Sequence, residues 1–375
     1  MKPQSPQKNK QQSLVLPSTK LPVLGICGPK GEGLTALIAT LLPELLKRGL
    51  QIAVVQHRDH NRLVEQPDQD SDCLYQAGAD LFLLDGSGSQ ECFLHGARRH
   101  SIAGAGLSYE LRRLSRHYDL VLVAGDEQAP VPKIWLLADA ESLPADTATV
   151  LRFFPPDETR SKQVLAFLLS WLQQLWAETP VWACVLIGGL SSRMGRPKHL
   201  LEKITTGTTW LENTVNLLQP LIGDHIALSG PGIVPDSLAH LPRLPDVPEA
   251  RGPLTGILAA MRWQPTVSWL LIACDMPHIN TEALAWLLDQ RRPGCWGTVP
   301  RLQEDGYVEP LLAHYDYRCG PLFEQLLASG SLRIGQIAGQ PKIEVPLIPR
   351  QLRSSWHNIN TPQELAVSRQ AEQLE

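Results

Sequence analysis

The chain has 375 residues, 43% hydrophobic and 19% charged, a composition typical of a globular protein with two or three folding units. Its 34 Lys and Arg against 38 Asp and Glu give a net charge of −4, which argues against a nucleic-acid-binding polycation. Its seven cysteines are scattered without a C-x-x-C pair, so we expect neither a disulfide framework nor a zinc knuckle. The sequence shows no secretory signal pattern and no apolar run of the roughly 20 residues that a membrane span needs. We therefore expect a cytoplasmic protein that binds neither nucleic acid nor membrane.

Residues 1–20 are rich in Gln, Pro, Ser and Lys, and we expect a disordered lead-in there. From residue 21 onward, short apolar runs alternate with helical patterns, which favours a parallel sheet flanked by helices. The apolar residues between 37 and 46 recur at helical spacing and predict a helix that Pro43 kinks. The expected strands are 23–27, 51–56, 80–84, 119–124 and 133–137.

An amphipathic helix is predicted at 162–177, and Thr179-Pro180 ends it. A second unit that starts with a strand follows, so we expect an α/β protein of two tandem domains, 21–178 and 179–375. The expected strands of the second domain are 181–187, 225–229, 269–274 and 310–314. Its expected helices are 209–218, 254–263, 281–290, 321–328 and 361–372.

The strand ending at Ile187 runs directly into a basic, glycine-rich segment, Gly188-Gly189-Leu190-Ser191-Ser192-Arg193-Met194-Gly195-Arg196-Pro197-Lys198. Adjacent glycines let the backbone approach a ligand closely and leave amides free to bind anionic oxygens. Arg193 and Lys198 add cations, so the segment fits a nucleoside triphosphate. The alternative is a glycine turn followed by solvated basic residues. The complete pattern favours binding.

Two carboxylates follow strand-like or turn-like segments of the second domain. Asp275 ends an apolar strand, at the edge where open α/β sheets bind ligands. A carboxylate opposite a phosphate loop can hold Mg²⁺ together with the phosphates; capping of a helix is the alternative. Asp246 lies among prolines, where it serves either as a nucleotide contact or as an ordinary turn residue.

The second domain resembles the MobA-type nucleotidyltransferases, which attach GMP to molybdopterin. The resemblance covers most of 181–375 and implies a Rossmann-like nucleotidyltransferase domain. It implies nucleotide-binding roles for Leu186, Ile187, Gly188, Gly189, Lys198, Asp246 and Asp275, catalytic roles for Arg193, Lys198 and Asp275, and a metal at Asp275. The resembling segments are 186–198, Asp246 with Gly252-Pro253-Leu254-x-Gly256, 271–277, Glu309-Pro310-Leu311, and Asn358-Ile359-Asn360-Thr361-Pro362. From the last segment, Asn360 is expected on the pterin side.

The choice of base is read from four residues at the start of the loop. The family's guanylyl branch usually carries Leu-Ala-Gly-Gly and its cytidylyl branch Leu-Ala-Ala-Gly. This chain has Leu186-Ile187-Gly188-Gly189, which keeps the guanylyl glycine and replaces the alanine by isoleucine. GTP is therefore the expected nucleotide.

Between a predicted strand and helix of the first domain stands Gly28-Pro29-Lys30-Gly31-Glu32-Gly33-Leu34-Thr35, a P-loop pattern with Leu34 in place of its lysine. The first domain resembles MobB, the GTP-binding partner of MobA, with neutral residues at three charged positions. Gln56 replaces the family's Lys before His57, and Ala124 replaces an acidic residue before Gly125. Our hypothesis is a degenerate P-loop NTPase-like domain that no longer hydrolyses GTP efficiently and serves for docking or dimerisation. Lys30 could substitute for the missing lysine.

The pair His57 and His60 also permits a metal site, with surface loop residues as the alternative.

The sequence thus predicts an enzyme that transfers GMP from GTP to molybdenum-molybdopterin with Mg²⁺, giving molybdopterin guanine dinucleotide and pyrophosphate. Its expected partners are GTP and molybdopterin, with molybdoenzymes or other cofactor-biosynthesis proteins as further candidates. The alternatives are a CTP- or sugar-phosphate-directed nucleotidyltransferase and a non-catalytic adaptor for the molybdenum cofactor. A nucleotide competition assay separates the first alternative, and pyrophosphate release separates the second.

Overall fold

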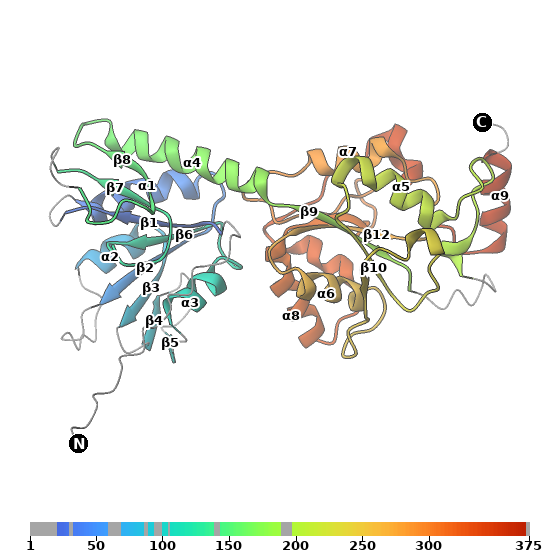
Figure 1. Ribbon diagram of the computed structural model, residues 1–375, viewed down its shortest axis with the longest axis horizontal. Coiled ribbons are helices and arrows are strands. Elements are labelled where there is room, and N and C mark those ends of the chain that lie inside the picture. The colour runs from blue at the N-terminus through green and yellow to red at the C-terminus, as the bar shows by residue number, and fades with distance from the viewer. Residues whose placement is uncertain are drawn as a thin grey trace, which may run out of the picture. The chain divides into compact units, whose positions relative to one another are not determined.

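The structure is a computed structural model that describes residues 21–29, 33–58, 69–85, 89–93, 100–103, 106–138, 143–188 and 197–372. The chain divides into two compact units, Met1–Leu168 and Leu169–Glu375 (Figure 1). This division falls inside a long helix, α4 (Arg160–Glu178). The expected domain boundary at the end of that helix stays a prediction, and the expected lead-in at 1–20 lies outside the described residues.

The first unit is built on a mixed sheet in the order β5-β4-β3-β2-β6-β1-β7-β8. The six strands from β3 to β8 in that order are parallel, while β4 and β5 extend the sheet in antiparallel fashion. The expected parallel sheet is confirmed, and each of its five predicted strands has a counterpart. The strands are β1 (Val23–Cys27), β2 (Ile52–Arg58), β3 (Asp80–Asp85), β4 (Ser89–Phe93), β5 (His100–Ala103), β6 (Leu120–Ala124), β7 (Lys133–Leu136) and β8 (Val150–Phe154).

Helices α1 (Leu34–Leu46), α2 (Gln69–Gln76) and α3 (Leu107–Leu114) join the strands of the first unit. The buried side chains of α1 recur at the spacing of one helical face, as the sequence predicts. Pro43 lies within α1, which continues to Leu46. In the described part of the chain, no helix combines the length and the apolar character that crossing a membrane requires.

The second unit contains a sheet in the order β11-β10-β9-β12-β14-β13-β15. Strands β11, β10, β9 and β12 are parallel, and β14 runs antiparallel to β12. The chain moves outward from β9 to β10 and β11, then returns to the other side of β9 with β12. The strands are β9 (Val181–Leu186), β10 (Ile226–Ser229), β11 (Arg243–Leu244), β12 (Ser268–Ala273), β13 (Gly297–Thr298), β14 (Leu312–Tyr315) and β15 (Ile343–Glu344).

Helices cover both faces of the second sheet (Figure 1). Alternate residues of β9 enter different cores: Cys184 packs on the face covered by α6 (Leu254–Trp263) and α8 (Gly320–Ala328). Val185 packs on the face covered by α5 (Trp210–Ile222) and α7 (Thr281–Asp289). A sheet buried on both faces explains why its central strands are almost continuously apolar in the sequence. The last helix is α9 (Pro362–Glu372).

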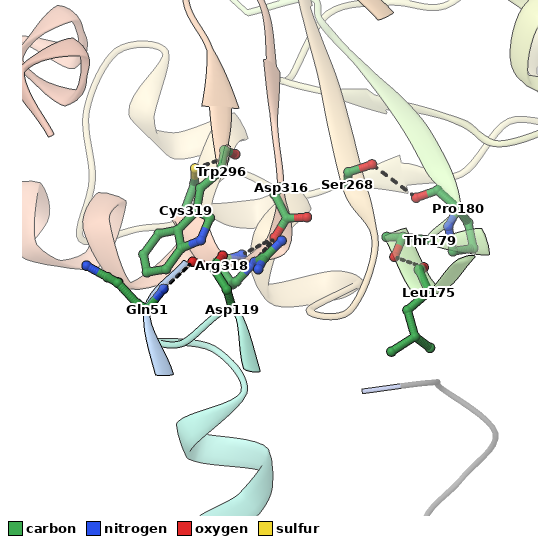
Figure 2. Close-up of polar contacts among 10 residues, drawn as sticks. All are labelled: Gln51, Asp119, Leu175, Thr179, Pro180, Ser268, Trp296, Asp316, Arg318 and Cys319. Carbon is green, nitrogen blue, oxygen red and sulfur yellow. Dashed lines mark hydrogen bonds and ion pairs between the residues drawn. The ribbon is translucent and has the colours of Figure 1, made fainter. Parts of the chain in front are cut away.

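Buried polar contacts fix the connections around this sheet (Figure 2). The Asp316 carboxylate accepts a hydrogen bond from Arg318 Nε at 2.7 Å, just after β14. The Cys319 thiol donates to the Trp296 carbonyl at 3.0 Å, which ties the start of α8 to the residue before β13. Where the strands begin, the Ser268 hydroxyl donates to the Pro180 carbonyl at 3.3 Å. These contacts hold the sheet on which the candidate site is built.

Candidate active site

The candidate site lies at the edge of the second sheet where its parallel strands end. Leu186, the last residue of β9, is paired with Ser229 of β10 and with Ala273 of β12. Gly188, after β9, and Asp275, after β12, therefore leave neighbouring strands at the same edge. The strand order reverses between β9 and β12, and ligands of open α/β sheets bind at such a switch point.

Three polar side chains meet at this switch point: Lys198, Asp275 and Asn360. The Lys198 ammonium lies 3.2 Å from Asp275 Oδ2 and donates to Asn360 Oδ1 at 2.7 Å. The side chains of Lys198 and Asp275 are only 13% and 22% exposed, so their ion pair is partly shielded from water. Two of the predicted catalytic residues, from segments far apart in the chain, are thus in direct contact.

Asn360 is held at the site by its own segment. The backbone amide of Ile359 donates to the Asp275 carbonyl at 2.9 Å, which joins the segment before α9 to the end of β12. The Glu364 carboxylate accepts from the backbone amides of Asn360 and Thr361 at 2.6 and 3.1 Å. These hydrogen bonds, foremost that from the Asn360 amide, lower the pKa of Glu364. The start of α9 is therefore capped in a way that fixes the backbone of Asn360.

The start of the glycine-rich loop is in close contact with the segment after β10. A Cβ at Gly230 would lie 2.5 Å from the Gly188 nitrogen, so only glycine fits where these two backbones meet. The Arg243 guanidinium donates to the carbonyls of Gly230 and Gly232 at 2.8 and 2.9 Å. The His199 imidazole donates to the Ile233 carbonyl at 2.8 Å, and burial lowers the pKa of His199. These positioning residues carry no motif of their own, although Gly230-Pro231-Gly232 is a recognisable turn sequence.

The predicted nucleotide-binding residues before the loop are buried. Leu186 is 8% and Ile187 2% exposed, and the Ile187 side chain packs in the core beneath α5. An isoleucine in place of the family's alanine is therefore accommodated by the core. Of the expected phosphate loop, 188–198, the structure describes Gly188, which is exposed, and Pro197 and Lys198 at its other end. Gly189 and Arg193 lie outside the described residues.

Asp246 follows β11 at the same edge of the sheet, on the far side of β10 from the Lys198–Asp275 pair. Its carboxylate accepts a hydrogen bond from the Thr255 hydroxyl at 3.2 Å. Gly252 has a φ of +62°, and a Cβ on Gly256 would lie 2.6 Å from the Leu186 side chain. Gly252 thus allows the turn before α6, and Gly256 allows α6 to pack closely on β9. The structure does not bring Asp246 into the cluster around Lys198.

One oxygen of Asp275 is available to a cation. Its Oδ1 is buried and has no hydrogen-bond partner among the described residues, whereas Oδ2 pairs with Lys198. Mg²⁺ is commonly held by one or two carboxylates together with substrate phosphates, so this lone buried oxygen fits a shared site. Within the described part of the chain, no three His, Cys, Asp or Glu side chains gather to hold a metal ion by themselves.

In the first unit, the degenerate P-loop connects β1 to α1 as predicted. Gly33 precedes α1 with a φ of +67°, and Leu34 is the first helical residue. Gln56, at the position of the family's lysine, accepts a hydrogen bond from the Ser71 hydroxyl at 3.1 Å. Lys30 lies outside the described residues, as do His60 and the side chain of His57, so the predicted histidine metal site stays a prediction.

Comparisons with known proteins find a different family model in each half of the chain. Residues 183–339 match the family model described as MobA-like NTP transferase domain, and residues 23–151 match that of Molybdopterin guanine dinucleotide synthesis protein B. A probable molybdenum cofactor guanylyltransferase of Bacillus cereus is 31% identical over 186 residues, 48% of this chain and 91% of that protein. A molybdenum cofactor biosynthesis bifunctional protein of Synechocystis sp. is 33% identical over 140 residues, 37% of this chain and 40% of that protein. The solved molybdopterin-guanine dinucleotide biosynthesis protein A from Archaeoglobus fulgidus is 24% identical, with a TM-score of 0.42 over 52% of this chain and 99% of its own.

Proposed function

The chain belongs to the family of molybdenum cofactor guanylyltransferases, and we propose that it transfers GMP from GTP to molybdenum-molybdopterin. It is a nucleotidyltransferase whose first half is MobB-like. In the proposed reaction, the terminal phosphate of molybdopterin attacks the α-phosphate of GTP. The bond from the α-phosphorus to the bridging oxygen breaks, and pyrophosphate leaves. The product is molybdopterin guanine dinucleotide.

The observation that carries this proposal is the cluster of Lys198, Asp275 and Asn360 at the switch point of the sheet. The Lys198 ammonium stands where it can offset charge on the triphosphate. Gly188 begins a loop whose amides, with Arg193, we propose as the remaining phosphate contacts. Asp246 is the proposed contact to the nucleoside part, since it lies on the β11 side of the same edge.

We propose Mg²⁺ as the metal and Asp275 Oδ1 as its protein ligand, because that oxygen is buried and has no other partner among the described residues. When bound, Mg²⁺ would polarise the α-phosphate and stabilise the leaving pyrophosphate. Lys198 pairs with the other oxygen of Asp275 and holds that carboxylate in place. Asn360 orients the ammonium and lies beside the expected position of the attacking phosphate.

The test is transfer of labelled GMP to molybdopterin by the full-length protein, with pyrophosphate release measured in parallel. A guanylyltransferase releases pyrophosphate only with the acceptor present and prefers GTP over CTP by a large factor. Equal use of CTP would favour the cytidylyl alternative. Absence of pyrophosphate under all of these conditions would favour a non-catalytic adaptor.

We propose a non-catalytic role for the MobB-like half, as a docking or dimerisation module. Leu34 occupies the P-loop lysine position, and Gln56 is bonded to Ser71. Without the lysine, the β- and γ-phosphates lose their main side-chain partner.

A further inference from the structure

A short hairpin next to the site carries a fully exposed aromatic side chain. Arg301 and Val308 form an antiparallel bridge, and between them the Gly306 amide donates to the Gln303 carbonyl at 3.0 Å. The Arg301 guanidinium donates to the Glu304 carbonyl at 2.7 Å, which braces the turn. Tyr307, at the end of the hairpin, is 95% exposed. A single exposed aromatic side chain is common on protein surfaces, so Tyr307 is of interest here only because of its position beside Glu309.

The residue after the bridge is a half-buried carboxyl group without a partner among the described residues. Burial raises the pKa of Glu309 to about 7, and no neighbouring charge contributes to that shift. Removing a carboxyl group from water without a compensating hydrogen bond destabilises the fold. Such a group near a site is a candidate for binding a ligand.

The topology places Glu309 at the edge where Asp275 stands. Because β14 is antiparallel to β12, its amino-terminal end lies beside the carboxyl end of β12. Ile272 pairs with Leu312, and the Ala273 amide donates to the Leu311 carbonyl at 2.8 Å. Glu309 comes two residues before Leu311, so it lies at the end of β14 that adjoins the carboxyl end of β12. Glu309 therefore borders the site on the β14 side, across β12 from the glycine-rich loop of β9.

The backbone here is extended, so Tyr307 and Glu309 project to the same side. Val308 is bridged to Arg301, and the Glu309 amide donates to the Pro300 carbonyl at 2.7 Å, as in an antiparallel ladder. Residues two apart in such a segment share a face. A carboxylate repels phosphate and accepts from N–H groups, whereas a tyrosine ring stacks on a planar partner. Together they suit a planar heterocycle with adjacent N–H groups, a feature that pterin and guanine share.

We propose that Tyr307 and Glu309 hold the pterin ring of the acceptor, the phenol ring by stacking and the carboxylate by accepting from the ring's N–H groups. This proposal rests on the function proposed above. Pterin is assigned rather than guanine because the triphosphate loop and Asp246 lie toward β9–β11, whereas the hairpin lies toward β14. The two heterocycles would then bind on opposite sides of Asp275.

The test compares the full-length chain with Tyr307→Ala and Glu309→Gln. Glu304→Gln removes a negative charge from the exposed part of the same hairpin and serves as the control. Steady-state GMP transfer is measured with GTP and the acceptor varied in turn. We expect the acceptor KM to rise about 10- to 100-fold in Glu309→Gln, the range for a charge-assisted hydrogen bond, and about 5-fold in Tyr307→Ala. The KM for GTP should stay within 2-fold, and Glu304→Gln should match the wild type.

A second measurement separates this proposal from the proposed function. Binding of free pterin to the full-length chain is followed by fluorescence quenching, which needs no turnover. If the two variants bind pterin more weakly than the wild type, the assignment stands even if no GMP is transferred. A raised KM for GTP with unchanged acceptor KM would assign the pair to guanine and overturn the proposal. Unchanged pterin binding in both variants would also overturn it.

Discussion

The contact between Gly188 and Gly230 gives a sharp test of the site, through the substitution Gly230→Ala. Gly230 has a φ of +121°, which strains any residue with a Cβ by about 1–2 kcal/mol. The new Cβ would also lie 2.5 Å from the Gly188 nitrogen and 2.9 Å from its Cα. Both are backbone atoms, so the two segments must separate by roughly 1 Å or remain overpacked, at a further cost of about 1–3 kcal/mol. The free energy of unfolding should fall by about 2–5 kcal/mol.

The same displacement moves the first amide of the proposed phosphate loop. A misplacement of about 1 Å can lower a rate by about 100-fold, so we expect kcat/KM for GTP to fall about 10- to 100-fold. Gly207→Ala is the matched control, because Gly207 has a φ of +67° and nothing within 4 Å of its added Cβ. It should lose about 1–2 kcal/mol of stability with unchanged kcat/KM. Stability is measured by denaturant unfolding and kcat/KM by GMP transfer. If both variants lose the same factor in kcat/KM for each kcal/mol of lost stability, the reasoning is refuted.

Other predictions concern single residues. Asp275→Asn should lower GMP transfer by about 1,000-fold or more with an unchanged circular dichroism spectrum, because it removes the proposed metal ligand and the partner of Lys198; near-wild-type transfer would exclude that role. Burial raises the pKa of Glu309 from 4.5 to about 7, so the unfolded chain releases this proton first as the pH rises. The free energy of unfolding should therefore decrease between pH 4.5 and 7, and Glu309→Gln should lack that decrease in urea titrations at several pH values. The proposed role of the first half is tested in the Asp275→Asn variant, in which the second half is inactive. GTP hydrolysis without acceptor should not exceed the uncatalysed rate there, since Leu34 replaces the P-loop lysine. Hydrolysis at the rate of an intact P-loop enzyme would contradict that role.

The central strands could be predicted from the sequence because they are buried on both faces. The continuous apolar runs of β1, β6, β9 and β12 stand out for this reason, and their predicted bounds are right to within a residue. Strands β11, β13 and β15 have only two residues each, too few to show any periodicity. Their pairing depends on long-range contacts with neighbouring strands, which no local pattern encodes. The antiparallel additions β4 and β5 were likewise not predicted.

The sequence predicts residues of the candidate site but not the contacts between them. The sequence indicates Lys198 and Asp275 as charged residues beside glycines and a buried strand, but it does not state that they form a pair. That pair joins positions 77 residues apart, and the Lys198–Asn360 hydrogen bond joins positions 162 apart. Arg243 and His199 were not predicted, because they hydrogen-bond to backbone carbonyls. In the sequence, residues with this role look the same as any other exposed arginine or buried histidine.

The contacts of Lys198 argue that the site is arranged for its ligand before the ligand arrives. An ammonium group has three N–H donors, and among the described residues Asp275 and Asn360 take two of them. The third can reach a phosphate oxygen without loss of the other two contacts. Asp275 Oδ2 in turn pairs with the lysine, while Oδ1 has no partner within the part of the chain that the structure describes. Cation and phosphate can therefore bind together without either one displacing the ammonium, and this avoids the reorganisation that would otherwise weaken charge stabilisation in the transition state.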